Sequence, residues 1–397
     1  MNDLEVLIMG GGLSGVSTAY HLAKAGVKDI MLVESGKIGI GSDEMLSGSN
    51  GPRFSKIIST SYENDYETDC MAVGEDKTIS FLDLSYKGTK MQIDIARQLD
   101  PAIVRQNGTI LVGHGIQKKW LMQEIGYYPE KYKKSFREVS IDELVEVFGA
   151  KRTAFQSGIF MPDDAVIDPS YVKLLSQKCD SIIAEGTKIT KLVEEEDGVR
   201  VYTDTAGNIK ARYVVNATNG FYTDSNLRGR LKQKWSYMFS FEDPGKNTPN
   251  SWEFAQKYHY WVRQDNITHV GGSDMIFEKK HARTGRFQEQ AMAKLKKWAY
   301  TKFPHLEGKK ILQEHYGVFA TTPDEIPIVG RFSDNSRIFY IVGCNAKGQS
   351  TLTYCASLMP GIMGYKKMTK EEQEFANLLS PIRQSIVKPI DPDYQMY

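Results

Sequence analysis

A short glycine-rich segment near the start of the chain limits its fold more than any other feature. It has the spacing GxGxxG, formed by Gly10, Gly12 and Gly15. Before it, residues 5–9 are an apolar run typical of a buried parallel strand, and after it residues 14–26 have the apolar spacing of a helix. A second apolar run, residues 29–33, ends at Glu34. This order predicts a βαβ unit.

Each part of this pattern has a physical reason in a dinucleotide site. Gly10 allows a tight turn, Gly12 lets the backbone approach a pyrophosphate, and Gly15 allows the helix to pack closely on the strand. The phosphates then lie at the positive N-terminus of the helix. Glu34 can accept hydrogen bonds from ribose hydroxyls. A glycine-rich turn without a ligand is the alternative, and the complete order of elements argues against it.

The composition is that of a globular protein and excludes several kinds of partner. The chain has 397 residues, 41% of them hydrophobic and 25% charged, which suits two domains. The net charge of +1 gives no electrostatic reason to expect nucleic acid or an anionic membrane as partner. No apolar run approaches the roughly 18 residues of a membrane helix. We find no secretory signal and expect a cytoplasmic protein.

Cysteine and histidine spacing gives no indication of a metal site. The four cysteines are far apart, without CxxC spacing, and are expected to be free thiols. His259 and His269 have no partners at metal-ligand spacing. We therefore expect no metal.

Later segments decide between a nicotinamide and a flavin dinucleotide. Residues 182–220 are predicted to form a strand, a hairpin and a strand. Near the C-terminus, the segment TTPDEIPIVG at 321–330 is followed by a predicted strand at 338–343 and a turn at 344–350. These segments look like further pieces of a flavin domain, whereas an NAD enzyme normally carries a catalytic domain with a distinct hydride-acceptor site. FAD is the expected cofactor.

Together these residues resemble the D-amino-acid oxidase superfamily, and within it the branch of sarcosine oxidase, glycine oxidase and γ-glutamylputrescine oxidase. The resemblance covers most of the chain in the same order and includes Arg383 after helix-ending residues. It implies an α/β plus antiparallel β fold, in which a Rossmann-like FAD-binding domain of the GR2 type is combined with a second, mainly antiparallel-sheet substrate domain. It assigns residues 1–85, 150–220 and 315–370 to the FAD domain, 86–149 and 221–314 to the substrate domain, and 371–397 to a C-terminal tail.

The resemblance also implies which residues surround FAD. They are the glycine turn, the acid at the second strand, several strand ends and the C-terminal turn: Gly10, Gly12, Leu13, Ser14, Gly15, Glu34, Ser35, Arg53, Ile189, Ala217, Thr218, Gly220, Gly330, Gly343, Asn345, Ala346, Lys347, Gly348, Gln349 and Ser350. Gly317 stands where sarcosine oxidase has the cysteine that bonds the flavin. We therefore expect FAD to be held non-covalently.

Five residues are candidates for the chemistry of the substrate: Lys56, Tyr258, Tyr260, Arg263 and Lys347. Lys56 replaces an arginine that clamps the substrate carboxylate in sarcosine oxidase, and lysine lacks the bidentate fork of arginine. A solvated surface cation is the alternative for Lys56. Lys347 faces either the flavin or solvent. Arg263 either binds an anionic or carbonyl group of the substrate or forms a salt bridge on its strand.

The family reaction is the oxidation of an amine or an N-substituted amino acid by hydride transfer to the flavin, giving an imine and, with O2, hydrogen peroxide. Phe319 stands where glycine oxidase has a carboxylate-binding arginine, which argues against a simple glycine or D-amino-acid oxidase. Two alternatives stay open. One is a dehydrogenase that passes electrons to a protein or a quinone, and the other is a flavoprotein subunit with structural FAD. The sequence does not indicate an oligomeric state.

Overall fold

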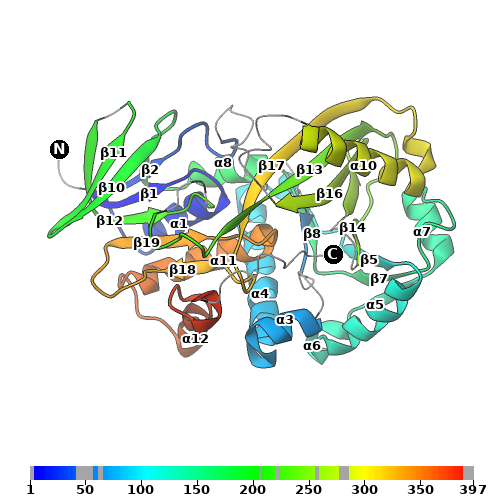
Figure 1. Ribbon diagram of the computed structural model, residues 1–397, viewed down its shortest axis with the longest axis horizontal. Helices are drawn as coiled ribbons and strands as arrows, with labels where there is room; N and C mark the ends of the chain where they lie inside the picture. Colours follow the sequence, from blue (N-terminus) through cyan, green and yellow to red (C-terminus); the bar gives the residue numbers. More distant parts are fainter. Residues whose placement is uncertain are drawn as a thin grey trace.

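The computed structural model of the chain describes residues 4–41, 57–60, 66–205, 207–219, 221, 224–254, 259–276 and 286–387. These residues form two eight-stranded sheets and one three-stranded sheet. Figure 1 shows the two large sheets at opposite ends of the molecule, with a long helix between them.

The first sheet contains the predicted βαβ unit. Its strands, in order across the sheet, are β10 (Ile189–Glu195), β11 (Gly198–Thr203), β12 (Asn208–Asn216), β1 (Leu4–Met9), β2 (Ile30–Val33) and β9 (Ser181–Ala184), with β19 (Ile338–Val342) beside β12 and β18 (Ile328–Gly330) beside β19. β1 pairs in parallel with β12 and β2, β2 with β9, and β12 with β19. The strand, hairpin and strand predicted over 182–220 are confirmed as β9, β10–β11 and β12.

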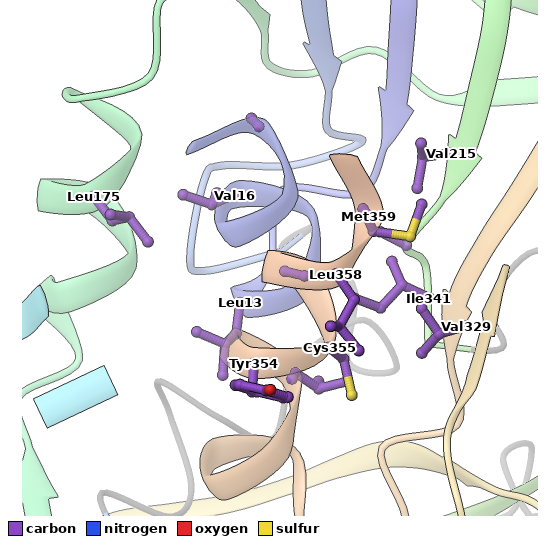
Figure 2. Packing of buried hydrophobic residues seen from close by; sticks show 14 of the residues in the cluster. Leu13, Val16, Leu175, Val215, Val329, Ile341, Tyr354, Cys355, Leu358 and Met359 are labelled. Carbon is purple, nitrogen blue, oxygen red and sulfur yellow. The ribbon is translucent and has the colours of Figure 1, made fainter. Parts of the chain in front are cut away.

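Helices cover one face of this sheet and form its core. They are α1 (Leu13–Lys24), α4 (Glu75–Leu99), α8 (Ser170–Ser176) and α11 (Gly348–Ile362). Figure 2 shows Val16 of α1 and Leu358 of α11 in this core, and both are 0% exposed. Burial of one such side chain stabilises the fold by about 1.5–3 kcal/mol. A Cβ at Gly88 of α4 would lie 2.0 Å from the carbonyl oxygen of Ser350, so α4 and α11 touch through their backbones.

The second sheet is mainly antiparallel. Its strands, in order, are β17 (Ile311–Thr321), β13 (Lys232–Glu242), β16 (Ile267–Ile276), β15 (Tyr260–Gln264), β14 (Asn250–Glu253), β5 (Thr109–Gly113), β7 (Ser157–Met161) and β6 (Arg137–Val139). Trp235 and Phe239 alternate along β13 and pack with Leu295 of helix α10 (Arg286–Lys302), which covers one face of the sheet. On the other face, Phe319 of β17 joins the core of the first sheet.

The remaining elements connect these layers. They are the small sheet of β3 (Ile57–Ile58), β8 (Ala165–Ile167) and β4 (Val104–Arg105), the helices α3 (Tyr66–Val73), α5 (Ile116–Tyr127), α6 (Glu130–Lys133), α7 (Ile141–Phe148) and α12 (Lys370–Leu379), and the 3-10 turns η1 (Pro101–Ile103), η2 (Pro304–Leu306) and η3 (Gln384–Val387). Among the described residues, no helix combines the length and the apolar character needed to cross a membrane.

The expected fold class, a Rossmann-like α/β layer with a mainly antiparallel second sheet, is confirmed. Three elements do not follow the predicted domain division. Strand β7 pairs in the second sheet although the prediction gives 150–220 to the FAD domain, and β17 runs across the boundary at 315. Helix α4 passes the boundary at 85 and packs on the first sheet. The exact division into domains stays a prediction.

Arg383 ties the end of the chain to the loop between β17 and β18. Its Nε donates to Oδ2 of Asp324 at 2.6 Å and its Nη2 to Oδ1 at 2.9 Å, with side chains only 5% and 1% exposed. Nη1 donates to the carbonyl oxygen of Pro327 at 3.1 Å. Burial alone would raise the pKa of Asp324, but the hydrogen bonds and the charge of Arg383 lower this pKa below its usual value.

Replacement of Arg383 by alanine is expected to lower the free energy of unfolding by about 3–5 kcal/mol, because Asp324 would remain buried without its partner. The contribution of the pair is present above the ordinary carboxyl pKa and is lost as the pH falls through the lowered pKa of Asp324. Urea unfolding at pH 7 measures the effect. Lys370→Ala, at a side chain 94% exposed, is the control, with an expected change within about 0.5 kcal/mol. Equal losses in the two variants would contradict this role of Arg383.

Candidate active site

The glycine turn between β1 and α1 packs backbone against backbone. Gly10 has φ +103°, and a Cβ there would lie 2.7 Å from the carbonyl oxygen of Ala217. A Cβ at Gly15 would lie 1.8 Å from the carbonyl oxygen of Gly10. Gly12 precedes the first residue of α1 in extended conformation, and no side chain caps the helix. The first amides of the helix can therefore bind an anion.

Glu34 lies at the end of β2 and links this strand to the glycine turn. Its Oε2 accepts from the amide of Gly11 at 2.7 Å, and its Oε1 accepts from Gly36 N at 2.8 Å and Ser35 Oγ at 3.1 Å. A carboxylate has about four acceptor positions, so Glu34 can still accept from a ribose hydroxyl. Ile189 begins β10 near this edge and is half-buried.

Ala217 and Thr218 follow directly after β12. The amide of Ala217 donates to Met9 O at 2.9 Å, and Ser14 Oγ donates to Ala217 O at 3.4 Å. Oδ1 of Asn216 accepts from the backbone and the hydroxyl of Thr218. The structure thus brings these two predicted residues against the glycine turn.

The turn between β19 and α11 completes this edge. Gly343, Asn345 and Ala346 have φ of +74°, +48° and +57°. Asn345 Oδ1 accepts from Thr322 N at 2.7 Å, and its Nδ2 donates to Gly343 O at 2.8 Å. No side chain caps α11, whose first residue is Gly348. A second uncapped helix N-terminus therefore lies at the same edge as α1, because β1, β12 and β19 are parallel.

Two other predicted residues of this segment have different surroundings. Gln349 Oε1 accepts from Gln92 Nε2 of α4 at 2.8 Å. Gly330 lies at the end of β18 remote from the turn, and a Cβ there would be 3.2 Å from Pro381. Its position is explained by packing against the C-terminal residues.

Lys347 is the buried cation at this turn. Lys347 is only 4% exposed, and its Nζ lies 5.8 Å from the ring centre of Trp252 in β14. The lysine therefore points toward the second sheet, and the solvent-facing alternative is excluded for it. Tyr260 lies beside Trp252, with ring centroids 5.6 Å apart, and its ring occupies the space left by Gly271.

Arg263 forms the salt bridge that was one of its two predicted roles. Its Nη1 lies 3.2 Å from Oδ2 of Asp243, and its Nε donates to Lys246 O at 2.7 Å. These contacts give no support to a role in binding the substrate. The predicted residues Arg53, Lys56, Gly220 and Tyr258 lie outside the described residues.

The face of the second sheet that carries Tyr260, called the wall below, also contains polar residues that the sequence did not indicate. Ser236 of β13 lies within hydrogen-bonding reach of both Asp274 and Tyr260. The dipeptide Gly271–Gly272 before Ser273 is the only local signal of an irregular strand in this region.

The geometry of the first sheet fits a dinucleotide. Gly10 and Gly15 leave no room for a Cβ at the turn, so the backbone there is free to approach a pyrophosphate. A family model described as FAD dependent oxidoreductase (DAO) matches residues 5–359. The chain belongs to the DAO family of FAD-dependent oxidoreductases. The expected family is confirmed, and its description as FAD dependent oxidoreductase agrees with the expected cofactor and with an oxidoreductase.

Individual relatives of this DAO-family chain are distant. Human mitochondrial dimethylglycine dehydrogenase is 26% identical over 230 residues, which are 55% of this chain and 23% of that protein. Glycine oxidase from Bacillus licheniformis is 24% identical over 362 residues, 85% of this chain and 87% of that protein. The structure of glycine oxidase from Geobacillus kaustophilus aligns with a TM-score of 0.74 and 14% identity over 96% of this chain and 99% of that one. The chain thus spans less than a quarter of the human dehydrogenase.

Gly15→Ala is expected to abolish retention of FAD, because the new Cβ would lie 1.8 Å from Gly10 O and force the helix away from the turn. The ratio of flavin to protein absorbance after purification measures retention, and circular dichroism measures folding. Gly126→Ala in the exposed part of α5, where a Cβ meets nothing within 4 Å, is the matched control. A Gly15→Ala protein with full flavin content would refute the assignment of this turn.

Proposed function

We propose that the chain oxidises the C–N bond of an amine or an N-substituted amino acid, with O2 as electron acceptor. The observation that carries the proposal is Lys347, a buried cation directed from the start of α11 toward the second sheet. FAD, when bound, accepts the hydride from the carbon beside the nitrogen. The residues of the chain bind the substrate, orient it and exclude water.

The apolar wall around Tyr260 supports oxidation of a neutral amine. Tyr260 and Val262 of the second sheet form a buried cluster with Ile57 and Val166, and Trp252 packs on it. Such surroundings disfavour the charged form of an amine. A neutral nitrogen has the lone pair that assists loss of hydride from the neighbouring carbon. The wall thus favours the reactive form of the substrate.

Lys347 is suited to bind an oxygen of the substrate. Its ammonium group has three donors, and the ring of Trp252 favours its positive charge. A buried carboxylate lies within its electrostatic reach. Burial raises the pKa of Asp164 to about 6, while the hydrogen bonds from Thr60 and the charge of Lys347 oppose this rise. We assign Lys347 to a carboxylate or carbonyl oxygen of the substrate.

A dehydrogenase is the second candidate, because human dimethylglycine dehydrogenase is among the relatives. The two candidates differ in the electron acceptor. After anaerobic reduction, an oxidase reoxidises rapidly when mixed with O2 in a stopped-flow instrument, whereas a dehydrogenase reoxidises slowly. A cytoplasmic location remains a prediction.

The visible spectrum of the purified protein tests the proposal directly. We expect flavin bands in the spectrum, and we expect heat treatment to release the flavin, because we expect it to be held non-covalently. Anaerobic addition of one amine or N-substituted amino acid is expected to bleach these bands. A yellow protein that no such compound bleaches would reject the proposed function and leave the structural-FAD alternative.

Lys347→Met is expected to lower kcat/KM by a factor on the order of 10–100, because a hydrogen bond to a charged group contributes about 1.5–3 kcal/mol. Steady-state kinetics with the amine found above measures the change, and the flavin absorbance confirms that FAD is retained. Lys297→Met, at an exposed position of α10, is the matched control. Unchanged kinetics in Lys347→Met would exclude a role of this residue in substrate binding.

A further inference from the structure

Asp274 lies at an irregularity in strand β16. Trp235 of β13 pairs with Met275 and Tyr237 pairs with Gly272, so two residues of β16 face the single residue between them on β13. The irregularity is a β-bulge, in which Gly272 has φ +125° and Ser273 has φ +59°. A bulge of this kind redirects side chains, and it is found near active sites.

The bulge turns Asp274 toward the face of the second sheet that carries Phe319, opposite the face covered by α10. Ser236 hydrogen-bonds Asp274, and Ser236 pairs with Gly317 two residues from Phe319, whose side chain joins the core of the first sheet. Tyr260 of the wall also lies within reach of Ser236. Asp274 therefore shares a face with the residues of the candidate active site.

A buried network holds the bulge from the opposite face. Ser273 Oγ lies 3.4 Å from His259 Nε2, and His259 Nδ1 lies 3.2 Å from Glu253 Oε2. The same Glu253 oxygen accepts from Trp298 Nε1 at 2.9 Å, and its other oxygen lies 3.1 Å from Lys302 Nζ. Partners of this kind keep a neighbouring functional residue in a fixed position.

Asp274 has acceptor capacity that the described residues do not use. Its Oδ1 is buried and accepts no hydrogen bond from them. Burial raises the pKa of Asp274 to about 6, against the effects of the Ser236 hydrogen bond and the charge of Lys234. A buried carboxylate oxygen without a hydrogen bond is costly, so its presence in the site needs a reason. A cationic ligand would satisfy it.

We propose that Asp274 binds a second, non-reacting ammonium group of the substrate, which makes the substrate a diamine, a polyamine derivative or a basic amino acid. This inference rests on the proposed amine oxidation. The bound group differs from the reacting nitrogen, because a carboxylate holds an ammonium in its protonated form, whereas hydride loss requires a neutral nitrogen. Asp274 is thus a specificity-determining residue.

The test compares linear α,ω-diamines of three to six carbons with the monoamines of the same chain length, on the flavin-bound protein. Titration calorimetry at pH 7.5 gives the dissociation constants for the wild type, for Asp274→Asn and for the control Asp197→Asn, whose carboxylate is 69% exposed. We expect the wild type and the control to bind at least one diamine about tenfold or more tightly than its monoamine. Asp274→Asn, which keeps its shape and its FAD, is expected to lose this preference.

The pH dependence gives a second readout. The diamine preference of the wild type is expected to fall as the pH is lowered through about 6, the pKa of Asp274, because the carboxyl is then neutral while the amines stay charged. The other titratable groups described near Asp274 are Lys234, Tyr237 and Tyr260. Burial raises the pKa of both tyrosines further above this pH range, so they stay neutral in it. The dependence should be absent in Asp274→Asn.

The outcomes separate this inference from the proposed function. A wild type without diamine preference, or an Asp274→Asn variant that keeps it, overturns the assignment of Asp274. Flavin reduction by amines is measured independently in the same samples. Diamine preference without any flavin reduction supports the cation site and rejects the amine oxidation.

Discussion

The FAD edge depends on direct contact between backbones of segments that are far apart in the sequence. The carbonyl oxygen of Ala217 lies where Gly10 would carry a Cβ, and the carbonyl oxygen of Gly10 lies where Gly15 would carry one. These contacts bring the ends of β1 and β12 and the start of α1 together. The turn after β19 lies at the same edge because the strands are parallel. Two uncapped helix N-termini therefore lie at one edge of the sheet, which is an arrangement suited to an anionic dinucleotide.

The two faces of the second sheet differ in how their carboxylates are paired. On the face of α10, Glu253 is paired with Lys302 and hydrogen-bonded by Trp298, so its burial is compensated. On the opposite face, one oxygen of Asp274 accepts no hydrogen bond from the described residues. Buried charges are normally paired, and this difference is the observation from which we propose a ligand for Asp274.

The sequence predicted the parts of the fold whose determinants are local. The glycine spacing, the alternation of strands and the acid at Glu34 lie within one short segment, and each has a fixed geometric meaning. The role of Arg263 could not be decided from the sequence, because its partner Asp243 becomes a neighbour only in the folded sheet. Asp274 was missed for a related reason. A one-residue bulge decides which face its side chain occupies, and strand alternation alone does not reveal a bulge.

The contact between Gly88 and Ser350 connects the candidate site to a distant part of the chain. A methyl group at position 88 would collide with the carbonyl oxygen of Ser350 in the first turn of α11. Lys347 directly precedes this turn. The distance between α4 and α11 therefore fixes the position of the Lys347 backbone. Position 88 of α4 is therefore restricted to glycine by its contact with α11, and not by the side-chain packing of α4 in the core. The turn that carries Lys347 therefore takes its position from a helix that contributes no predicted ligand-binding side chain.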